Sequence, residues 1–138
     1  MRKNIVAGNW KMNTDLADTQ ELIAGLKKIS KTSDAEVIIA PPFTNLYSAF
    51  ETLKDSDIEV AAQNMHQSSS GAFTGEISAA MLKGVGVKTV ILGHSERRAY
   101  FGEKEDLLAE KVNAAVENEM KMLSKVSVFK FFTKTVDH

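Results

Sequence analysis

The sequence predicts an α/β fold in which short parallel strands alternate with crossover helices. Four short apolar runs recur along the chain, and a segment with helical spacing of its apolar residues follows each one. This alternation predicts parallel pairing, because each helix returns the chain to the same end of the sheet. The runs are continuously apolar, as expected for strands with two buried faces. An open doubly wound sheet and the first half of a (β/α)8 barrel both fit, and periodicity alone does not choose between them.

The strands are expected at residues 4–8, 35–40, 58–63 and 88–92, and the helices at 16–30, 43–53, 78–83 and 105–119. Asn13 or Thr14 can cap the first helix. Arg97 and Arg98 are expected in structural ion pairs. The acidic and basic residues from Glu103 to Lys111 are expected on a solvated helix face.

The pattern changes beyond residue 121. Residues 122–138 are rich in β formers, yet no helical segment follows them. They are either a fifth strand or a divergent C-terminal tail, so we divide the chain into 1–121 and 122–138. Four or five strands would leave two open parallel edges and an exposed apolar inner face, unless the Phe-rich tail covers it.

Composition restricts the class of protein. A chain of 138 residues has room for one domain, and its net charge of -1 gives no attraction to nucleic acid or to an anionic membrane. It has no cysteine, which excludes disulfides and thiolate metal sites, and its histidines lack metal-ligand spacing. No apolar run approaches the roughly 18 residues of a membrane span. We expect a soluble cytoplasmic protein without a metal site.

Polar residues stand directly after the first and fourth strands. Asn9 and Lys11 follow the first, where a lysine can bind a phosphate, although a lone lysine there is more often an ordinary surface residue. His94 follows the fourth, before a helical turn whose N-terminus would keep the imidazole neutral and able to donate to a carbonyl; a structural histidine is the alternative. Glu96 is either an active-site acid or the partner of Lys11. We expect Lys11 and His94 to leave neighbouring strands at the same end and converge.

The segment from Gln63 to Ser78 is unusually long for a loop between a strand and a helix, and such a length suggests a function. Gly71 and Gly75 flank its tip, where Phe73 could anchor a partner. A mobile surface loop is the alternative.

Four motifs, each at a strand end and in this order, resemble the triosephosphate isomerase family. They are Gly8-Asn9-Trp10-Lys11-Met12-Asn13, Ala40-Pro41-Pro42, Ala62-Gln63-Asn64 with Gly71-Ala72-Phe73-Thr74-Gly75-Glu76, and Leu92-Gly93-His94-Ser95-Glu96-Arg97-Arg98. The resemblance runs from Ile5 to about Lys121. It implies a partial (β/α)8 TIM barrel that consists of the first four βα units, with or without a fifth strand.

The resemblance also implies a reaction. Asn9 and Lys11 would bind the substrate, with Lys11 at its phosphate, and His94 would polarise its carbonyl, while Ser95 and Glu96 would support them. The implied reaction interconverts dihydroxyacetone phosphate and glyceraldehyde 3-phosphate through an enediolate, in glycolysis and gluconeogenesis. The family needs no metal or cofactor for it.

A homodimer is implied in the same way. The long loop, with Phe73 and Thr74 at its tip, would insert into the partner subunit close to the partner's Lys11.

The chain departs from the family in its length. A (β/α)8 barrel has about 250 residues, and the family's glutamate base, lid and glycine-rich phosphate loops come after its fifth strand. We therefore expect this chain to be inactive, or nearly so, on its own. The alternatives are a non-enzymatic half-barrel that self-associates and a split enzyme completed by a separate C-terminal half.

Overall fold

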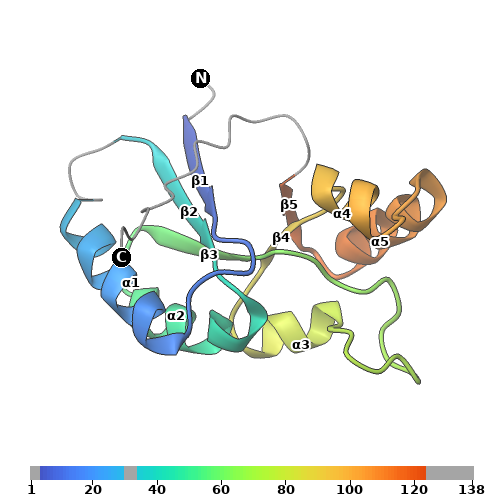
Figure 1. Cartoon of the computed structure of the whole chain (residues 1–138), viewed down its shortest axis with the longest axis horizontal. Coiled ribbons are helices and arrows are strands. Elements are labelled where there is room, and N and C mark those ends of the chain that lie inside the picture. The colour runs from blue at the N-terminus through green and yellow to red at the C-terminus, as the bar shows by residue number, and fades with distance from the viewer. Residues whose placement is uncertain (1–3, 30–33, 124–138) are drawn as a thin grey trace.

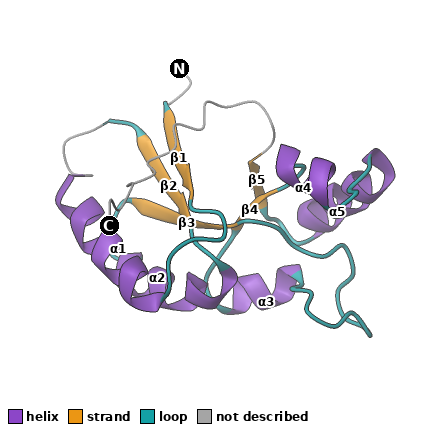
Figure 2. Ribbon diagram, in the orientation of Figure 1, coloured by secondary structure: helices purple, strands orange, loops and turns teal. Residues whose placement is uncertain are grey.

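The computed structural model describes residues 4–29 and 34–123, which form one curled parallel sheet with helices packed against it (Figures 1 and 2). The strands stand in the order β1-β2-β3-β4-β5, each parallel to its neighbours. They are β1 (Ile5–Asn9), β2 (Glu36–Ala40), β3 (Ile58–Ala62), β4 (Thr89–Ile91) and β5 (Lys121–Leu123). The four expected strands and a fifth are confirmed. From residue 124 on, the predicted tail lies outside the described residues.

Helices follow the strands as predicted. They are α1 (Leu16–Ile29), the short η2 (Phe43–Asn45) that leads into α2 (Leu46–Leu53), α3 (Ala79–Gly84), α4 (Ser95–Tyr100) and α5 (Glu105–Glu117). Helices α1, α2 and α3 lie along the outside of the sheet, and α4 and α5 lie beside β4 and β5 (Figure 2).

The first helix begins with a cap that the sequence prediction misplaced. Asp15, rather than Asn13 or Thr14, caps α1: its Oδ1 accepts the backbone N–H of Asp18 at 2.9 Å. The Asp18 carboxylate accepts in return from the Asp15 N–H at 3.4 Å, which is the reciprocal pattern of a capping box. The hydroxyl of Thr14 is used elsewhere, because it bonds to that of Thr19 at 3.1 Å.

Alternation along each strand sends side chains to two apolar clusters. Ile39, Val60 and Val90 point outward and pack with residues of the covering helices, among them Ile23 and Leu82. This outer cluster is the larger one and holds the helices on the sheet.

The second cluster lies on the concave inner face and consists of Ile38, Ala40, Ala61 and Ile91, with Ala7 and Leu123 against them. Ile38 is 1% and Ile91 3% exposed, so the expected exposure of the inner face does not hold at these residues. The covering role expected of the Phe-rich tail lies outside the described residues. Curling of the sheet turns inner side chains of successive strands toward one another, so they pack together.

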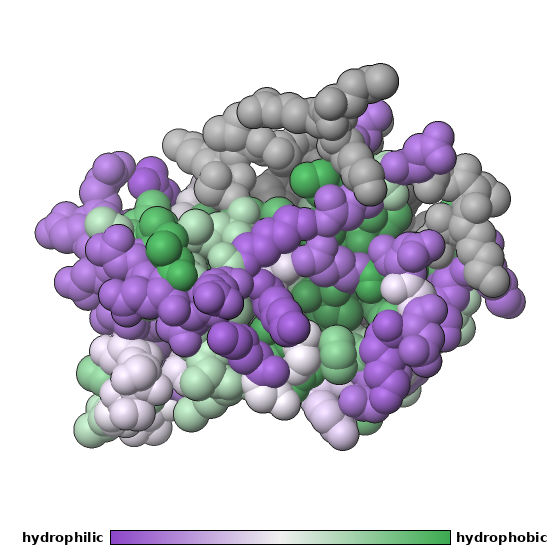
Figure 3. Space-filling view, turned by 180° about the vertical axis from the view of Figure 1, so that it is seen from behind, coloured by the Kyte–Doolittle hydropathy of each residue, from purple (hydrophilic) through white to green (hydrophobic). Residues whose placement is uncertain are grey.

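The predicted open edge is confirmed at β1. Among the described residues β1 pairs with β2 alone, and Ile5 and Val6 are 37% and 40% exposed. Seen from behind, the molecule shows apolar areas between hydrophilic side chains (Figure 3). The expected burial of both strand faces therefore fails in β1, beside which the described part of the chain places a strand on one side only.

A polar layer lies at the N-terminal ends of the inner face, formed by Glu36, Glu59, Thr89 and Lys121. The ammonium group of Lys121 on β5 pairs with Glu36 on β2 and with Glu59 on β3, the latter at 3.1 Å, and Thr89 bonds to Glu59. Two strands separate β2 from β5 in the sheet. A lysine reaches across them only because the sheet is curled, so the structure is a half-barrel rather than a flat open sheet.

Candidate active site

The loop after β1 presents Lys11 in an unusual backbone conformation. Lys11 has φ of 55°, in the left-handed region that side chains other than glycine rarely adopt, and Thr14 has φ of 76°. Asn9 stabilises the turn, because its Oδ1 accepts the Lys11 N–H at 2.9 Å. The Lys11 side chain is 36% exposed.

His94 occupies the corresponding position after β4. It is the N-cap residue of α4, and its Nδ1 accepts the backbone N–H of Glu96 at 3.2 Å. A ring nitrogen that accepts a hydrogen bond carries no proton, so in the neutral ring the proton is on Nε2. The His94 side chain is only 12% exposed. The predicted helical turn after His94 is confirmed as α4, which begins at Ser95.

Glu96 joins the two strand ends. Its Oε1 forms an ion pair with the Lys11 Nζ, and its Oε2 lies 3.7 Å from the His94 Nδ1. Of the two roles weighed for Glu96, the structure shows the partner of Lys11. The expectation that Lys11 and His94 leave neighbouring strands is wrong, since β2 and β3 stand between β1 and β4. The curl of the sheet closes that gap.

Gln63, directly after β3, is a site residue to which the sequence reasoning gave no role. Its Nε2 donates to the backbone oxygen of Lys11 and to that of Ala40, both at 2.9 Å. Gln63 thus ties the ends of β1 and β2 to that of β3. Its place after a buried strand was the available signal, the same one that singled out Asn9 and His94.

A buried ionic network lies behind the site and was also missed. Glu103 accepts from the Arg97 Nε at 2.9 Å and from the Lys111 Nζ at 3.1 Å, and Lys111 donates to the Asn64 Oδ1 at 2.9 Å. Glu103 and Lys111 are each 3% exposed, so the predicted solvated face is wrong at these two residues, whereas the charged residues between them, from Lys104 to Glu110, are exposed as predicted. The available signal was Lys111 itself, a charged residue at a position where the buried face of α5, which also holds Ala115, would ordinarily have an apolar residue.

Two opposing effects act on the pKa of Glu103. Burial raises it, but the hydrogen bonds and charges of Arg97 and Lys111 outweigh burial and hold the pKa below its ordinary value of 4.5. The network joins α4 and α5 to the loop after β3. Arg98 pairs separately with Glu105 at 3.1 Å, so the expected ion pairs of both arginines are confirmed.

The long loop after β3 protrudes from the molecule beyond α3, away from the end of β1 (Figure 1). Phe73 is 47% exposed, and its ring lies 4.3 Å from that of His66, centroid to centroid. Thr74 is exposed beside it. The tip of the loop is therefore separated from the end of β1, whereas the loop begins at Gln63, which contacts Lys11.

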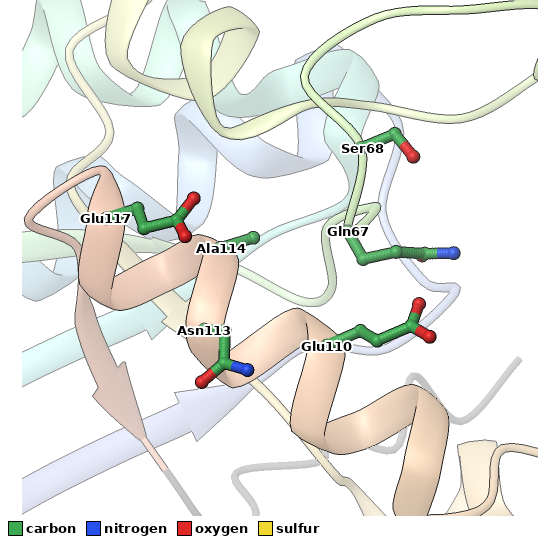
Figure 4. A pocket seen from close by; sticks show the side chains of 6 residues that line it. All are labelled: Gln67, Ser68, Glu110, Asn113, Ala114 and Glu117. Atoms are coloured by element: carbon green, nitrogen blue, oxygen red, sulfur yellow. The ribbon is translucent and has the colours of Figure 1, made fainter.

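An open hollow of about 290 Å³ lies between this loop and α5 (Figure 4). Gln67 and Ser68 line it from the loop, and Glu110, Asn113 and Glu117 line it from α5. None of the predicted site residues lines this hollow. The candidate active site is instead the open cluster at the strand ends.

Fold and site together define a class: a partial (β/α)8 barrel whose polar side chains gather at the C-terminal ends of its strands, where enzymes of this fold carry their active sites. Among the described residues, no helix is long and apolar enough to cross a membrane, and no group of acidic or histidine side chains could hold a metal ion. A family model of triosephosphate isomerase matches residues 4–126. The chain belongs to the triosephosphate isomerase family.

Individual relatives agree with this assignment. The chain is 55% identical over 124 residues to a triosephosphate isomerase of Flavobacterium johnsoniae, covering 89% of this chain and 50% of the relative. It is 51% identical over 115 residues to one of Clostridium acetobutylicum, covering 83% of this chain and 46% of the relative. The chain therefore spans about half the length of the curated relatives it matches.

Proposed function

We propose that the ends of β1, β3 and β4 form one half of a triosephosphate isomerase site. The observation that carries the proposal is the meeting of Lys11 and His94 around Glu96, although two strands separate them in the sheet. A phosphorylated triose needs a cation for its phosphate and a hydrogen-bond donor for its carbonyl oxygen. Lys11 and His94 are groups of these two kinds.

In this proposal each residue has a distinct role. Lys11 binds the substrate phosphate and stabilises developing negative charge, with Asn9 beside it. His94 donates a hydrogen bond from its Nε2–H to the carbonyl oxygen and so polarises the carbonyl as the enediolate forms, since Nδ1 accepts the Glu96 N–H. Ser95 and Glu96 hold His94 and Lys11 in place. The reaction interconverts dihydroxyacetone phosphate and glyceraldehyde 3-phosphate.

The reaction also requires a base next to the carbonyl, and a general base contributes about 10²–10⁴-fold to a rate. Glu96 has a carboxylate close to both Lys11 and His94, but this carboxylate already forms an ion pair with Lys11. We propose that turnover needs the C-terminal half of a barrel, and that residues 1–138 without such a half are inactive or nearly so. Residues 122 and 123 belong to β5 and the family model extends to residue 126, so a divergent tail would begin beyond the expected boundary at residue 122.

Exposed aromatic side chains support a proposed homodimer. Phe73 on the long loop is 47% exposed, and Tyr100 and Phe101 at the end of α4 are 78% and 68% exposed. Aromatic residues are enriched where proteins associate. We propose that the loop tip with Phe73 and Thr74 contacts a partner subunit, and that the protein acts in the cytoplasm in glycolysis and gluconeogenesis.

A coupled isomerase assay tests the catalytic proposal. The chain is assayed alone and after mixing with the C-terminal half of the Flavobacterium johnsoniae relative. We expect no turnover alone and a gain on mixing, and no gain when the chain carries Lys11→Met. Turnover alone near that of an intact relative would refute the need for a second half, and no gain on mixing would refute the half-site. A stable monomer in size-exclusion chromatography would refute the homodimer.

A further inference from the structure

The loop that carries Lys11 is held in a strained conformation. Lys11 and Thr14 both have positive φ, at 55° and 76°. A non-glycine residue in this region costs on the order of 1–3 kcal/mol and persists only where its surroundings impose it. Some interaction must therefore hold this loop, and its hydrogen bonds identify the residues that do so.

Two carboxamides fix the loop from outside. At one end, Gln63 donates to the backbone oxygen of Lys11 at 2.9 Å. At the other end, the buried Asn45 donates to the backbone oxygens of Thr14 and Asp15 at 3.1 and 3.2 Å. Both carboxamides come from other βα units, so tertiary structure imposes the conformation of the loop.

Gln63 has the more direct connection to the chemistry. Its second hydrogen bond, to the Ala40 oxygen, ties it to the end of β2, and that same oxygen accepts the Trp10 N–H at 3.0 Å. The carboxamide therefore stands at a fixed point between three strand ends. One of its two hydrogen bonds is to the backbone of Lys11, whose ammonium group forms the ion pair with Glu96.

We propose that Gln63 is a positioning residue: its carboxamide holds Lys11 in the left-handed conformation that aims the ammonium group at the substrate phosphate. This inference rests on the proposed function for the ligand, but the backbone effect can be measured without any ligand. A carboxylate in the same place has no proton to give to either carbonyl oxygen, whereas its protonated form can donate one hydrogen bond.

The first measurement uses backbone NMR of the full chain. The Cα and Cβ chemical shifts of Lys11 report its φ in the wild type and in Gln63→Met, with Gln67→Met in the following loop as the matched control. We expect Lys11 to leave the left-handed region in Gln63→Met alone. In Gln63→Glu we expect Lys11 to leave the left-handed region at pH 7, and its chemical shifts to return toward the wild-type values as the new carboxyl group is protonated. This second variant provides the test if Gln63→Met does not fold.

The second measurement is a titration with glycerol 3-phosphate, followed at Lys11 and His94, with glycerol as the control without phosphate. We expect the dissociation constant to rise about tenfold or more in Gln63→Met, because a charged hydrogen bond is misplaced, and to stay unchanged in Gln67→Met. Unchanged Lys11 shifts in both Gln63 variants would overturn the positioning role. A wild-type chain that does not bind glycerol 3-phosphate would instead refute the proposed function, and the shift measurement would still decide the role of Gln63.

Discussion

Replacing Lys111 by methionine should destabilise this half-barrel more than any surface substitution. The Lys111 ammonium group is buried and bonds to the carboxylate of Glu103 and to the amide oxygen of Asn64. Lys111→Met keeps most of the side-chain length but leaves a buried carboxylate with Arg97 as its remaining cation. Removing one partner of a buried ion pair costs about 3–5 kcal/mol. The whole stability of a domain is about 5–15 kcal/mol, so the loss should be obvious.

Urea denaturation at pH 7 measures this loss, with Lys83→Met as the control. Lys83 is an exposed lysine that donates to the backbone oxygen of Asn118 at 3.0 Å, and substitutions at such positions change stability by about 0.5 kcal/mol or less. A Lys111→Met variant no less stable than Lys83→Met would refute the reasoning, because the buried ion pair would then contribute nothing.

The pH dependence gives a second, independent test. The pKa of Glu103 is lower in the folded protein than its ordinary value of 4.5, so its contribution to stability is present above pH 4.5 and is lost as the pH falls through the folded pKa. In Lys111→Met the upward effect of burial is opposed by Arg97 alone, so Glu103 binds a proton at higher pH. The stability gap between wild type and variant should therefore shrink as the pH falls from 7 to below 4.5. A constant gap would contradict the assignment of the loss to Glu103.

Three further predictions concern the scaffold. Gly86→Ala should lower the free energy of unfolding by about 1–3 kcal/mol, because its φ is 88° and a Cβ would lie 2.3 Å from the Phe50 ring. Gly25→Ala should instead raise the free energy of unfolding by about 0.5–1 kcal/mol, because Gly25 lies within helix α1 and a Cβ there would meet nothing within 4 Å. Asp15→Ala should lower the free energy of unfolding by about 1 kcal/mol through loss of the α1 cap. Urea denaturation measures the Gly86, Gly25 and Asp15 variants. An equal effect of the two glycine variants would contradict the prediction for Gly86. Burial lowers the pKa of Lys121, but its two carboxylate partners outweigh burial and raise it above 10.5. The wild type should therefore lose stability as the pH rises through that raised pKa, and Lys121→Met should lack this alkaline loss in a pH series of melting temperatures.

The sequence alone determined the order and type of the elements. Apolar runs of strand length and helical spacings are local patterns, so each can be recognised without knowing what it packs against. The same holds for the motifs at the strand ends, because position directly after an apolar run of strand length is itself a local property. Asn9, Lys11 and His94 were found in this way. Even so, the cap of α1 was misplaced by one residue, since several neighbouring side chains can serve as caps.

Tertiary structure decided what these residues do to one another. The curl of the sheet brings Lys11 and His94 to Glu96 across two intervening strands, and it lets Lys121 reach Glu36. No local pattern encodes that curvature. The hydrogen bond from Gln63 to the backbone oxygen of Lys11 likewise comes from another βα unit. Glu103 and Lys111 resemble an ordinary solvated pair in the sequence, and only the packing of α4 and α5 buries them, because contacts between distant segments determine which charges lose water.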